Sequence, residues 1–415
     1  MSLLKKKILY VENGIGYGGA IICLRHLVRH LDRNRFEPLV VTGRTSPDYQ
    51  AIANEARWQY IPDRHFDNVS LRRRLAKQAW LNKVPSLHFI SKQLLARGDD
   101  LFNFLPFFLR LLWVAKCFRA DLIHANNEPF CNRAALLVAK VLQIPCICHI
   151  RGGDHEGSQL MQWTYSLPDH FISVSHWVAK SLQENLHIAA NKISVVYDGI
   201  ALEKLNIYAD GTQFRDAYHV ADDDFAVGLV GLLIPWKGQV LFLEAAKLLR
   251  SKIPCLKMLI IGGTPDDCIA YEALLRQRVK DEQLTEMIIF TGHISSMETV
   301  YNGLDVVLSA STQPEPLGTV VIEAMAMGRP IIAPNHGGAA EMILHDETGL
   351  LFDPGDIQSL ANAIEKLCCS KSLRVKLGEN ARSVAIKSFA VEDHVRHIQN
   401  IYQQLLGWPI GNVSN

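Results

Sequence analysis

Short apolar runs alternate with longer amphipathic segments along the whole chain. In the first half the strand-like runs are Ile8–Val11, Pro38–Thr42, Asp121–Ala125, Pro145–His149 and Phe171–Val174. In the second half they are Ala226–Leu232, Lys257–Ile261, Ile288–Phe290, Val306–Ser309 and Pro330–Ala333. Continuously apolar strands that alternate with helices are typical of parallel sheets covered on both faces. The pattern therefore predicts an α/β protein built from two doubly wound, Rossmann-like units in tandem.

The length of the chain also favours two domains, because 415 residues exceed the roughly 250–300 that one hydrophobic core serves. A strand at Ile193–Val196 ends in Asp198-Gly199, and a polar, irregular stretch follows. We expect an N-terminal domain at residues 1–198 and a C-terminal domain at 199–390. A final amphipathic helix in residues 391–415 has the length to pack back on the N-terminal domain, although the sequence alone does not place it.

Composition excludes several kinds of partner. The 43 basic residues nearly balance the 42 acidic ones, so we expect no nucleic-acid partner. The nine cysteines are an odd number and lack any Cys-x-x-Cys pair, which argues against a zinc site and against a disulfide framework. The first residues lead straight into an apolar strand without the pattern of a signal peptide. These features predict a cytoplasmic protein with buried thiols.

A basic stretch and an apolar run interrupt the alternation. From Arg64 to Arg97 there are eight basic residues against one acid, and the apolar run Leu101–Phe118 follows. Basic side chains beside apolar and aromatic ones are typical of a peripheral membrane contact on the inner face of an anionic membrane. The alternative is a core helix beside a solvated basic face. We reject a transmembrane helix because the run is short and contains Arg110 and Lys116.

The loop after the first strand contains a G-x-G-x-x-G pattern from Gly14 to Gly19. Glycines there let the backbone approach a phosphate at a helix start. An NAD(P)-dependent oxidoreductase would also have an acid about 20 residues on, and Leu39–Thr42 offers none. A tight strand-to-helix turn without a ligand remains a further alternative.

In the second half, Lys237-Gly238 opens a predicted helix at Gln239–Arg250, directly after an apolar strand. A cation beside the amides of a helix start suits a diphosphate. The alternative is a solvated lysine without a ligand.

The most informative segment runs from Glu315 to Glu323. It follows the strand Val306–Ser309, and the edge beyond the strand ends is where open α/β sheets bind ligands. The amides of Leu317, Gly318 and Thr319 at the start of a short helix suit phosphate oxygens, while the two glutamate carboxylates suit the adjacent hydroxyls of a ribose or a hexose. A buried glutamate in an apolar helix is costly without a ligand or a partner. The alternative is a structural, salt-bridged glutamate.

These motifs together resemble the retaining glycosyltransferases of family 4, also called glycosyl transferases group 1, which have the GT-B fold. The resemblance is carried in order by Tyr17–Ala20, Asp121–Ala125, Ile172–Ser175, Ile193–Gly199, Val230–Leu233, Lys237-Gly238, Glu315–Glu323, Gly337-Gly338 with Glu341, and Thr348-Gly349. The two glutamates eight residues apart are its most specific part. The resemblance implies two Rossmann-like domains facing a central cleft.

The resemblance also implies roles for individual residues. Glu323 would hold the donor ribose, Lys237 and the amides of Leu317–Thr319 the diphosphate, and Glu315 the hydroxyls of the transferred sugar. Gly18 and Gly19 would line the cleft from the first domain. His149, at the end of its strand, matches the active-site histidine of the family, so His149 and Glu315 are the catalytic candidates.

A sugar transferase of this kind is expected to need no metal or other cofactor. The resemblance implies retention of the anomeric configuration through a front-face, oxocarbenium-like path, with a nucleotide sugar as donor and a glycan or lipid-linked acceptor. Two positions depart from the family. Leu232 stands where many relatives have a phosphate-binding arginine, and Asp198–Ala201 alters a signature near the domain boundary. One interpretation is that Lys237 and Arg151 carry the diphosphate, and another is that the donor differs from that of the relatives. The further alternative is a catalytically weak or inactive nucleotide-sugar-binding protein.

Overall fold

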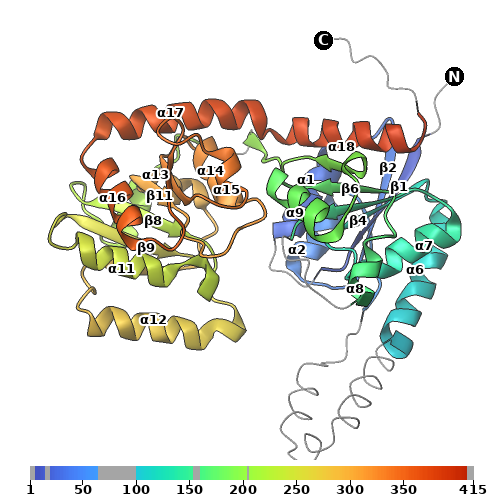
Figure 1. Ribbon diagram of the computed structural model, residues 1–415, viewed down its shortest axis with the longest axis horizontal. Coiled ribbons are helices and arrows are strands. Elements are labelled where there is room, and N and C mark those ends of the chain that lie inside the picture. Colours follow the sequence, from blue (N-terminus) through green and yellow to red (C-terminus); the bar gives the residue numbers. More distant parts are fainter. Residues whose placement is uncertain (1–4, 15–18, 64–99, 153–158, 203–204, 409–415) are drawn as a thin grey trace, which may run out of the picture. The chain divides into compact units, whose positions relative to one another are not determined.

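The computed structural model describes residues 5–14, 19–63, 100–152, 159–202 and 205–408, and it divides into two compact units (Figure 1). The N-terminal unit comprises residues up to Ser173 together with Ser181–Ser194 and the chain from Val395. The C-terminal unit comprises Val174–Lys180 and Val195–His394. Both are α/β units, as the hydrophobic pattern predicts, and the expectation of two Rossmann-like domains is confirmed.

The N-terminal unit contains a seven-stranded sheet with the order β3-β2-β1-β4-β5-β6-β7. Its strands are β1 (Lys6–Glu12), β2 (Phe36–Thr42), β3 (Arg57–Tyr60), β4 (Leu122–Asn126), β5 (Cys146–Ile150), β6 (His170–Ser173) and β7 (Ile193–Val195). The chain moves outward from β1 to β3 and then returns to the other side of β1 at β4, so β1 and β4 flank the point where the winding reverses. Ligands of open parallel sheets bind at such a point.

Helices connect these parallel strands. They are α1 (Gly19–His30), α2 (Pro47–Gln50), α6 (Leu105–Phe118), α7 (Arg133–Leu142), α8 (Gln159–Thr164) and α9 (His176–Leu186), and a π-helical turn at Asp100–Phe104 leads into α6. In α1, Ile21, Leu24 and Val28 recur at the helical period and are buried, which fixes that face against the sheet. The chain leaves α7 through Gln143, whose left-handed backbone ends the helix.

The C-terminal unit contains a six-stranded sheet with the order β10-β9-β8-β11-β12-β13. Its strands are β8 (Phe225–Val230), β9 (Leu256–Ile261), β10 (Ile288–Gly292), β11 (Val306–Leu308), β12 (Ile331–Pro334) and β13 (Leu350–Phe352). The winding reverses between β8 and β11, which pair directly in parallel. The loops that follow β8 and β11 are therefore the expected ligand-binding loops of this unit.

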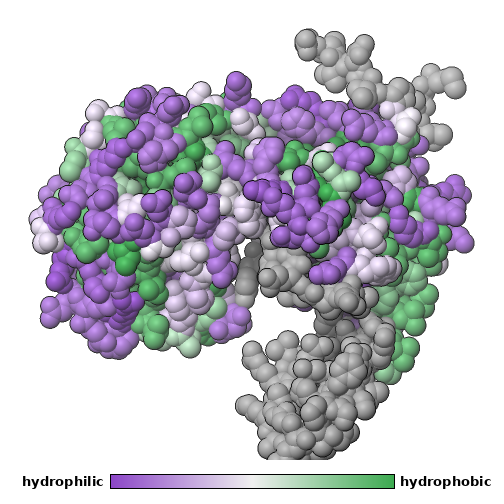
Figure 2. Space-filling model, in the orientation of Figure 1, coloured by the Kyte–Doolittle hydropathy of each residue, from purple (hydrophilic) through white to green (hydrophobic). Residues whose placement is uncertain are grey.

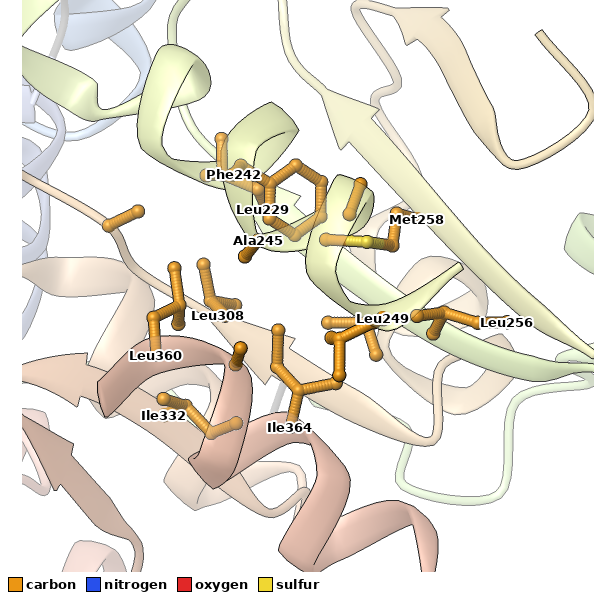
Figure 3. Packing of buried hydrophobic residues seen from close by; sticks show 14 of the residues in the cluster. Leu229, Phe242, Ala245, Leu249, Leu256, Met258, Leu308, Ile332, Leu360 and Ile364 are labelled. Carbon is orange, nitrogen blue, oxygen red and sulfur yellow. The ribbon is translucent and has the colours of Figure 1, made fainter. Parts of the chain in front are cut away.

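Its helices are α10 (Thr212–Ala217), α11 (Gln239–Leu249), α12 (Ile269–Asp281), α13 (Met297–Gly303), α14 (Thr319–Ala326), α15 (Ala339–Met342), α16 (Ile357–Cys368) and α17 (Lys371–Ser388). Figure 3 shows the core beneath α11 and α16, where Phe242 and Leu249 of α11 face Leu360 and Ile364 of α16 over the strands. These four side chains are fully buried. The apolar stripes to which they belong hold α11 and α16 on the sheet.

The last helix, α18 (Val391–Leu405), belongs to both units, because Val395 and the residues after it are part of the N-terminal unit. Its Tyr402 is fully buried there, and its hydroxyl lies 2.6 Å from Nδ1 of His124 and donates to the hydroxyl of Tyr10 at 3.1 Å. Within the C-terminal unit, a Cβ on Gly199 would lie 2.6 Å from Cα of Val391, so glycine permits a close approach there.

Candidate functional site

The loop after β8 lies against the loop after β11. Gly238 has a left-handed backbone with φ of 81°, and a Cβ there would lie 1.8 Å from the carbonyl oxygen of Ala310. The amide of Thr312 donates to the carbonyl of Trp236 at 2.8 Å. Since only glycine fits this approach, the Lys237-Gly238 sequence fixes the lysine beside the segment that contains the two glutamates.

Lys237 and Glu315 form an ion pair at the reversal point of the C-terminal sheet. Nζ of Lys237 lies 2.8 Å from Oε2 of Glu315, and the two side chains are 17% and 14% exposed. Ser311 donates to the other carboxylate oxygen, and the ammonium group lies 4.7 Å from the ring centre of Trp236. A cation and a carboxylate are thus presented together at a partly exposed strand end, where one can attract a phosphate and the other can accept from hydroxyls.

Glu315 leads directly into the start of α14. Gly318 caps that helix in a left-handed conformation with φ of 86°, Leu317 is buried, and Thr319 is the exposed first helical residue. The first amides of an α-helix have no partner within the helix and carry its positive dipole end. The structure therefore brings Leu317, Gly318 and Thr319 next to the Lys237 and Glu315 pair, as an anion-binding arrangement requires.

Gly337 and Gly338, which belong to the family pattern, pack closely against this loop. A Cβ on Gly337 would lie 2.5 Å from the carbonyl oxygen of Glu315, and a Cβ on Gly338 would lie 2.6 Å from Cα of Leu317. The amide of Gly338 also donates to the carbonyl of Glu315 at 2.8 Å. The glycines therefore allow the closely packed support that holds Glu315 and Leu317 in place.

Glu323 lies in the second turn of α14 and has a partner that sequence reasoning did not identify. The hydroxyl of Tyr301, on α13, donates to Oε2 of Glu323 at 2.5 Å. Burial raises the pKa of Glu323, while the hydrogen bond from Tyr301 opposes that rise; burial and the nearby carboxylate raise the pKa of Tyr301 well above its usual range. The only signal in the sequence was the cost of a glutamate in an apolar helix, which called for a partner without naming it.

His149 and Arg151 follow each other at the end of β5 in the N-terminal unit, but their surroundings differ. The side chain of His149 is fully buried, and its ring centre lies 5.4 Å from that of His124. Arg151 is half-buried, and its Nε donates to Oδ1 of Asn126 at 3.1 Å. Of the two candidates, Arg151 is therefore the one with partial exposure at the strand end.

A buried carboxylate, also unforeseen, organises the reversal point of the N-terminal sheet. Glu12, the last residue of β1, is 1% exposed and accepts from the amide of Gly14 and from Nδ2 of Asn127, both at 2.7 Å. Its other oxygen accepts from Asn126, which in turn accepts from Arg151. Burial raises the pKa of Glu12, and the hydrogen bonds and the charge of Arg151 oppose that rise.

The predicted site residues thus form two groups. Lys237, Glu315, Leu317, Gly318, Thr319 and Glu323 gather at the β8 and β11 ends of the C-terminal unit. His149 and Arg151 lie at the end of β5 in the N-terminal unit, and Gly19 begins α1 there, while Gly18 lies outside the described residues. Within the described part of the chain, no group of three or more His, Cys, Asp and Glu side chains is arranged to hold a metal ion.

Comparisons with known protein families match both halves of the chain. The family model for glycosyl transferases group 1 matches residues 210–384, and the model for glycosyltransferase family 4 matches residues 17–204. A capsular polysaccharide biosynthesis glycosyltransferase, CapM of Staphylococcus aureus, is 28% identical over 52% of this chain and 56% of its own length. N-acetyl-alpha-D-glucosaminyl L-malate synthase of Bacillus anthracis is 25% identical over 79% of this chain and 86% of its own length.

Solved structures match the fold over nearly the whole chain. The structure of Alr3699/HepE of Anabaena in complex with UDP has a TM-score of 0.79 at 22% identity and covers 96% of this chain and 100% of its own. A glycosyltransferase from Rickettsia africae has a TM-score of 0.80 at 19% identity, with 97% and 99% covered. With both halves matched by family models and the GT-B architecture present, the chain belongs to the group 1 glycosyltransferases.

Proposed function

We propose that this protein transfers a sugar from a nucleoside diphosphate sugar to a glycan or lipid-linked acceptor, without a metal ion and with retention of the anomeric configuration. The observation that carries the proposal is the Lys237–Glu315 ion pair beside the start of α14, with Glu323 in the next turn. A cation, helix-start amides and two carboxylates at one strand edge match the phosphate, ribose and sugar parts of such a donor.

Each donor group has a proposed partner in the C-terminal unit. Lys237 and the amides of Leu317–Thr319 take the diphosphate, and Glu315 takes hydroxyls of the transferred sugar. Glu323 takes the ribose diol, because Tyr301 already donates to one of its oxygens and a carboxylate has further lone pairs to offer to hydroxyls. Among the structural relatives, the Anabaena protein was solved with UDP and with UDP-glucose, which favours UDP among the nucleotides to test first.

Loss of the diphosphate is the step that these groups would assist. As the bond between the anomeric carbon and the diphosphate oxygen lengthens, negative charge grows on the leaving group, and a fixed cation with aligned amides stabilises it. Glu315 would then lie at the reacting sugar, where an oxocarbenium-like centre gains from a nearby carboxylate. His149 is proposed to contribute by shaping the β5 end rather than by direct contact, because its side chain is fully buried.

A second candidate function has an observation of its own. Leu232 lies in the loop after β8, where many relatives carry an arginine, and its carbonyl accepts from Nε2 of buried Gln239 at 2.9 Å. A nucleotide-sugar-binding protein with weak or no transfer activity would fit a site with one cation fewer. Rapid sugar transfer by the purified protein would exclude this candidate, whereas tight donor binding with little or no turnover would establish it.

The test of the proposed function is a thermal-shift panel of nucleoside diphosphates and nucleotide sugars, followed by turnover of the radiolabelled donor that stabilises the protein most. A ligand that binds only the folded state raises its stability with affinity, so the correct base is expected to stand out. If Glu323→Ala leaves donor turnover unchanged, the assignment of the ribose site is wrong. Stabilisation by NADPH and not by UDP or GDP would instead favour an oxidoreductase.

We place the proposed reaction in the cytoplasm. No disulfide joins any two of the nine cysteines, all of which lie in the described residues. Cys146 and Cys148 are buried in β5, whereas Cys117, Cys255 and Cys369 are exposed, so the expectation of buried thiols is met only in part. Burial raises the pKa of the Cys148 thiol, so it stays protonated and unreactive. Free thiols are typical of proteins from reducing compartments.

A further inference from the structure

One helix of the N-terminal unit leaves a line of large apolar side chains uncovered. Leu101, Leu105, Leu109 and Trp113 recur every four residues along the π-helical turn and α6, and they are 56%, 40%, 54% and 67% exposed. Residues four apart lie on one side of a helix. Figure 2 shows apolar residues gathered along α6, in the position that Figure 1 gives it. Large exposed apolar patches mark interaction surfaces.

The opposite side of α6 packs in the core of the N-terminal unit. Phe107, Leu111 and Val114 are at most 4% exposed, and α6 packs against α7. Contrary to the expectation that this run is too short, Leu101–Phe118 is long and apolar enough to cross a membrane by length and composition, but 33% of it is buried inside the protein. Because the buried side holds the helix to its unit, the exposed side can meet a membrane only along its surface, as an interfacial helix does.

The basic side chains near the exposed apolar residues favour an anionic partner. Arg110, Lys116 and Arg119 are exposed on the same helix and its end, and no acidic residue occurs from Leu101 to Ala120. An anionic lipid surface would attract these cations, while the apolar side chains enter the interface and the Trp113 ring sits at its polar edge. A second copy of the same face would instead oppose like charges.

We propose that this α6 face, made of Leu101, Leu105, Leu109 and Trp113 with Arg110, Lys116 and Arg119, binds the surface of an anionic bilayer. The helix lies in the plane of the interface with its buried side toward its own unit. The inference is independent of the sugar-transfer proposal, since none of these residues belongs to the proposed donor site.

The first experiment measures binding of the full chain to vesicles of phosphatidylcholine with and without phosphatidylglycerol by flotation. The unaltered protein is expected to float with the anionic vesicles and to be released by salt. The variant Leu105→Gln/Leu109→Gln/Trp113→Gln is expected to bind at least about tenfold more weakly, because burial of apolar area drives interfacial helices into lipid. Unchanged binding of this variant would overturn the proposal, because another part of the chain would then hold the vesicle.

A matched control removes exposed apolar side chains elsewhere. Ile269 and Leu274 on α12 of the C-terminal unit are each 60% exposed, and Ile269→Gln/Leu274→Gln is expected to float like the unaltered protein. Equal loss in both variants would show a general effect of surface hydrophobicity and would overturn the assignment to α6. The charge term is tested by Arg110→Gln/Lys116→Gln, which is expected to weaken binding to anionic vesicles about tenfold or more and to leave binding to neutral vesicles unchanged.

The alternative occupant is a second copy of the chain. Sedimentation of the protein without lipid is expected to give one species of monomer mass for the unaltered chain and for the triple variant. A dimer that the triple variant abolishes, together with no flotation, would assign the α6 face to self-association instead. Melting temperatures of the three variants, measured in parallel, confirm that each is folded, since all substituted side chains are exposed.

Discussion

The two units share a winding but place different chemistry at the point where it reverses. In the N-terminal unit, the edge between β1 and β4 carries Glu12, which is buried and surrounded by amide donors. In the C-terminal unit, the edge between β8 and β11 carries Lys237 and Glu315, which are paired and still partly exposed. The parallel sheet thus provides the same edge twice, and the side chains make one edge a buried hydrogen-bond network and the other a partly exposed ion pair.

The difference lies in how each charge is compensated. Glu12 has its charge distributed over Gly14, Asn126 and Asn127 within the unit, so little of its hydrogen-bonding capacity is left for a ligand. Lys237 has one carboxylate partner and further donors on its ammonium group. Hydrogen bonds from a cation to a phosphate are charge-assisted and strong, which favours the C-terminal edge as the proposed donor site.

The largest effect is expected from removal of the C-terminal cation. Lys237→Ala should lower kcat/KM for the donor by about 10²–10³-fold, because one donor to a developing negative charge is worth about 2.7–4 kcal/mol. The control is Lys247→Ala on the exposed side of α11, where Lys247 pairs with Glu244 at 3.1 Å and little change is expected. If Arg151→Ala lowers kcat/KM more than Lys237→Ala does in the same assay, the N-terminal edge contributes more to donor turnover than the C-terminal edge, which would contradict the comparison.

Glu12→Ala should chiefly destabilise the fold. The variant removes the acceptor of the Gly14 amide and of the Asn127 side chain and leaves Asn126 only the carbonyl of Ala20, at a cost of about 1.5–3 kcal/mol in the free energy of unfolding. Urea unfolding measures the loss. Thermal stabilisation by the donor nucleotide is expected to persist, and its disappearance would show that the N-terminal network also serves the donor site.

The raised pKa of Glu12 makes its contribution to the free energy of unfolding depend on pH. Since the pKa in the folded state lies above the ordinary value of 4.5, the stability linked to its proton is fully present below that value and is lost as pH rises through the folded-state pKa. Glu12→Gln lacks this titration. Urea unfolding at a series of pH values should therefore give a steeper fall for the unaltered protein than for Glu12→Gln, and parallel curves would contradict the assignment.

Tyr301→Phe should have a smaller effect, confined to the donor site. One lost hydrogen bond is worth about 0.5–1.5 kcal/mol, or about two- to tenfold in donor affinity. The hydroxyl of Tyr301 favours the ionised form of Glu323, so its removal raises the pKa of that carboxyl further. Donor affinity then begins to fall at a higher pH as the solution is acidified, and calorimetric titration across pH detects the shift. An unshifted profile would separate Glu323 from ribose binding.

Leu232→Arg is expected to have the smallest effect and the opposite sign. A guanidinium at the partly exposed end of β8 should raise donor affinity by about two- to fivefold, since partly exposed ion pairs contribute up to about 1 kcal/mol. A large gain in kcat instead would favour the interpretation that the natural protein is a weak enzyme.

Much of the fold was predictable because hydrophobic periodicity is a local property. The predicted helix at Gln239–Arg250 corresponds to α11 within one residue at each end, and the short helix predicted to start at Leu317–Thr319 is α14. The strands β3 and β13 were not predicted, because β3 is a half-exposed edge strand with polar residues and β13 contains only three residues. Short or polar strands form through their neighbours in the sheet rather than through their own pattern.

The sequence by itself determined the two α/β units, the family and the segment with the paired glutamates, since apolar period, glycine turns and helix caps act between residues close together in the chain. Only the tertiary structure decided that Lys237 pairs with Glu315, that Tyr301 supports Glu323, that Glu12 holds Asn126, and that His149 is buried. It also decided which side of α6 stays uncovered. An apolar pattern predicts that a residue favours burial, whereas the packing of elements distant in the chain decides which apolar residues are buried.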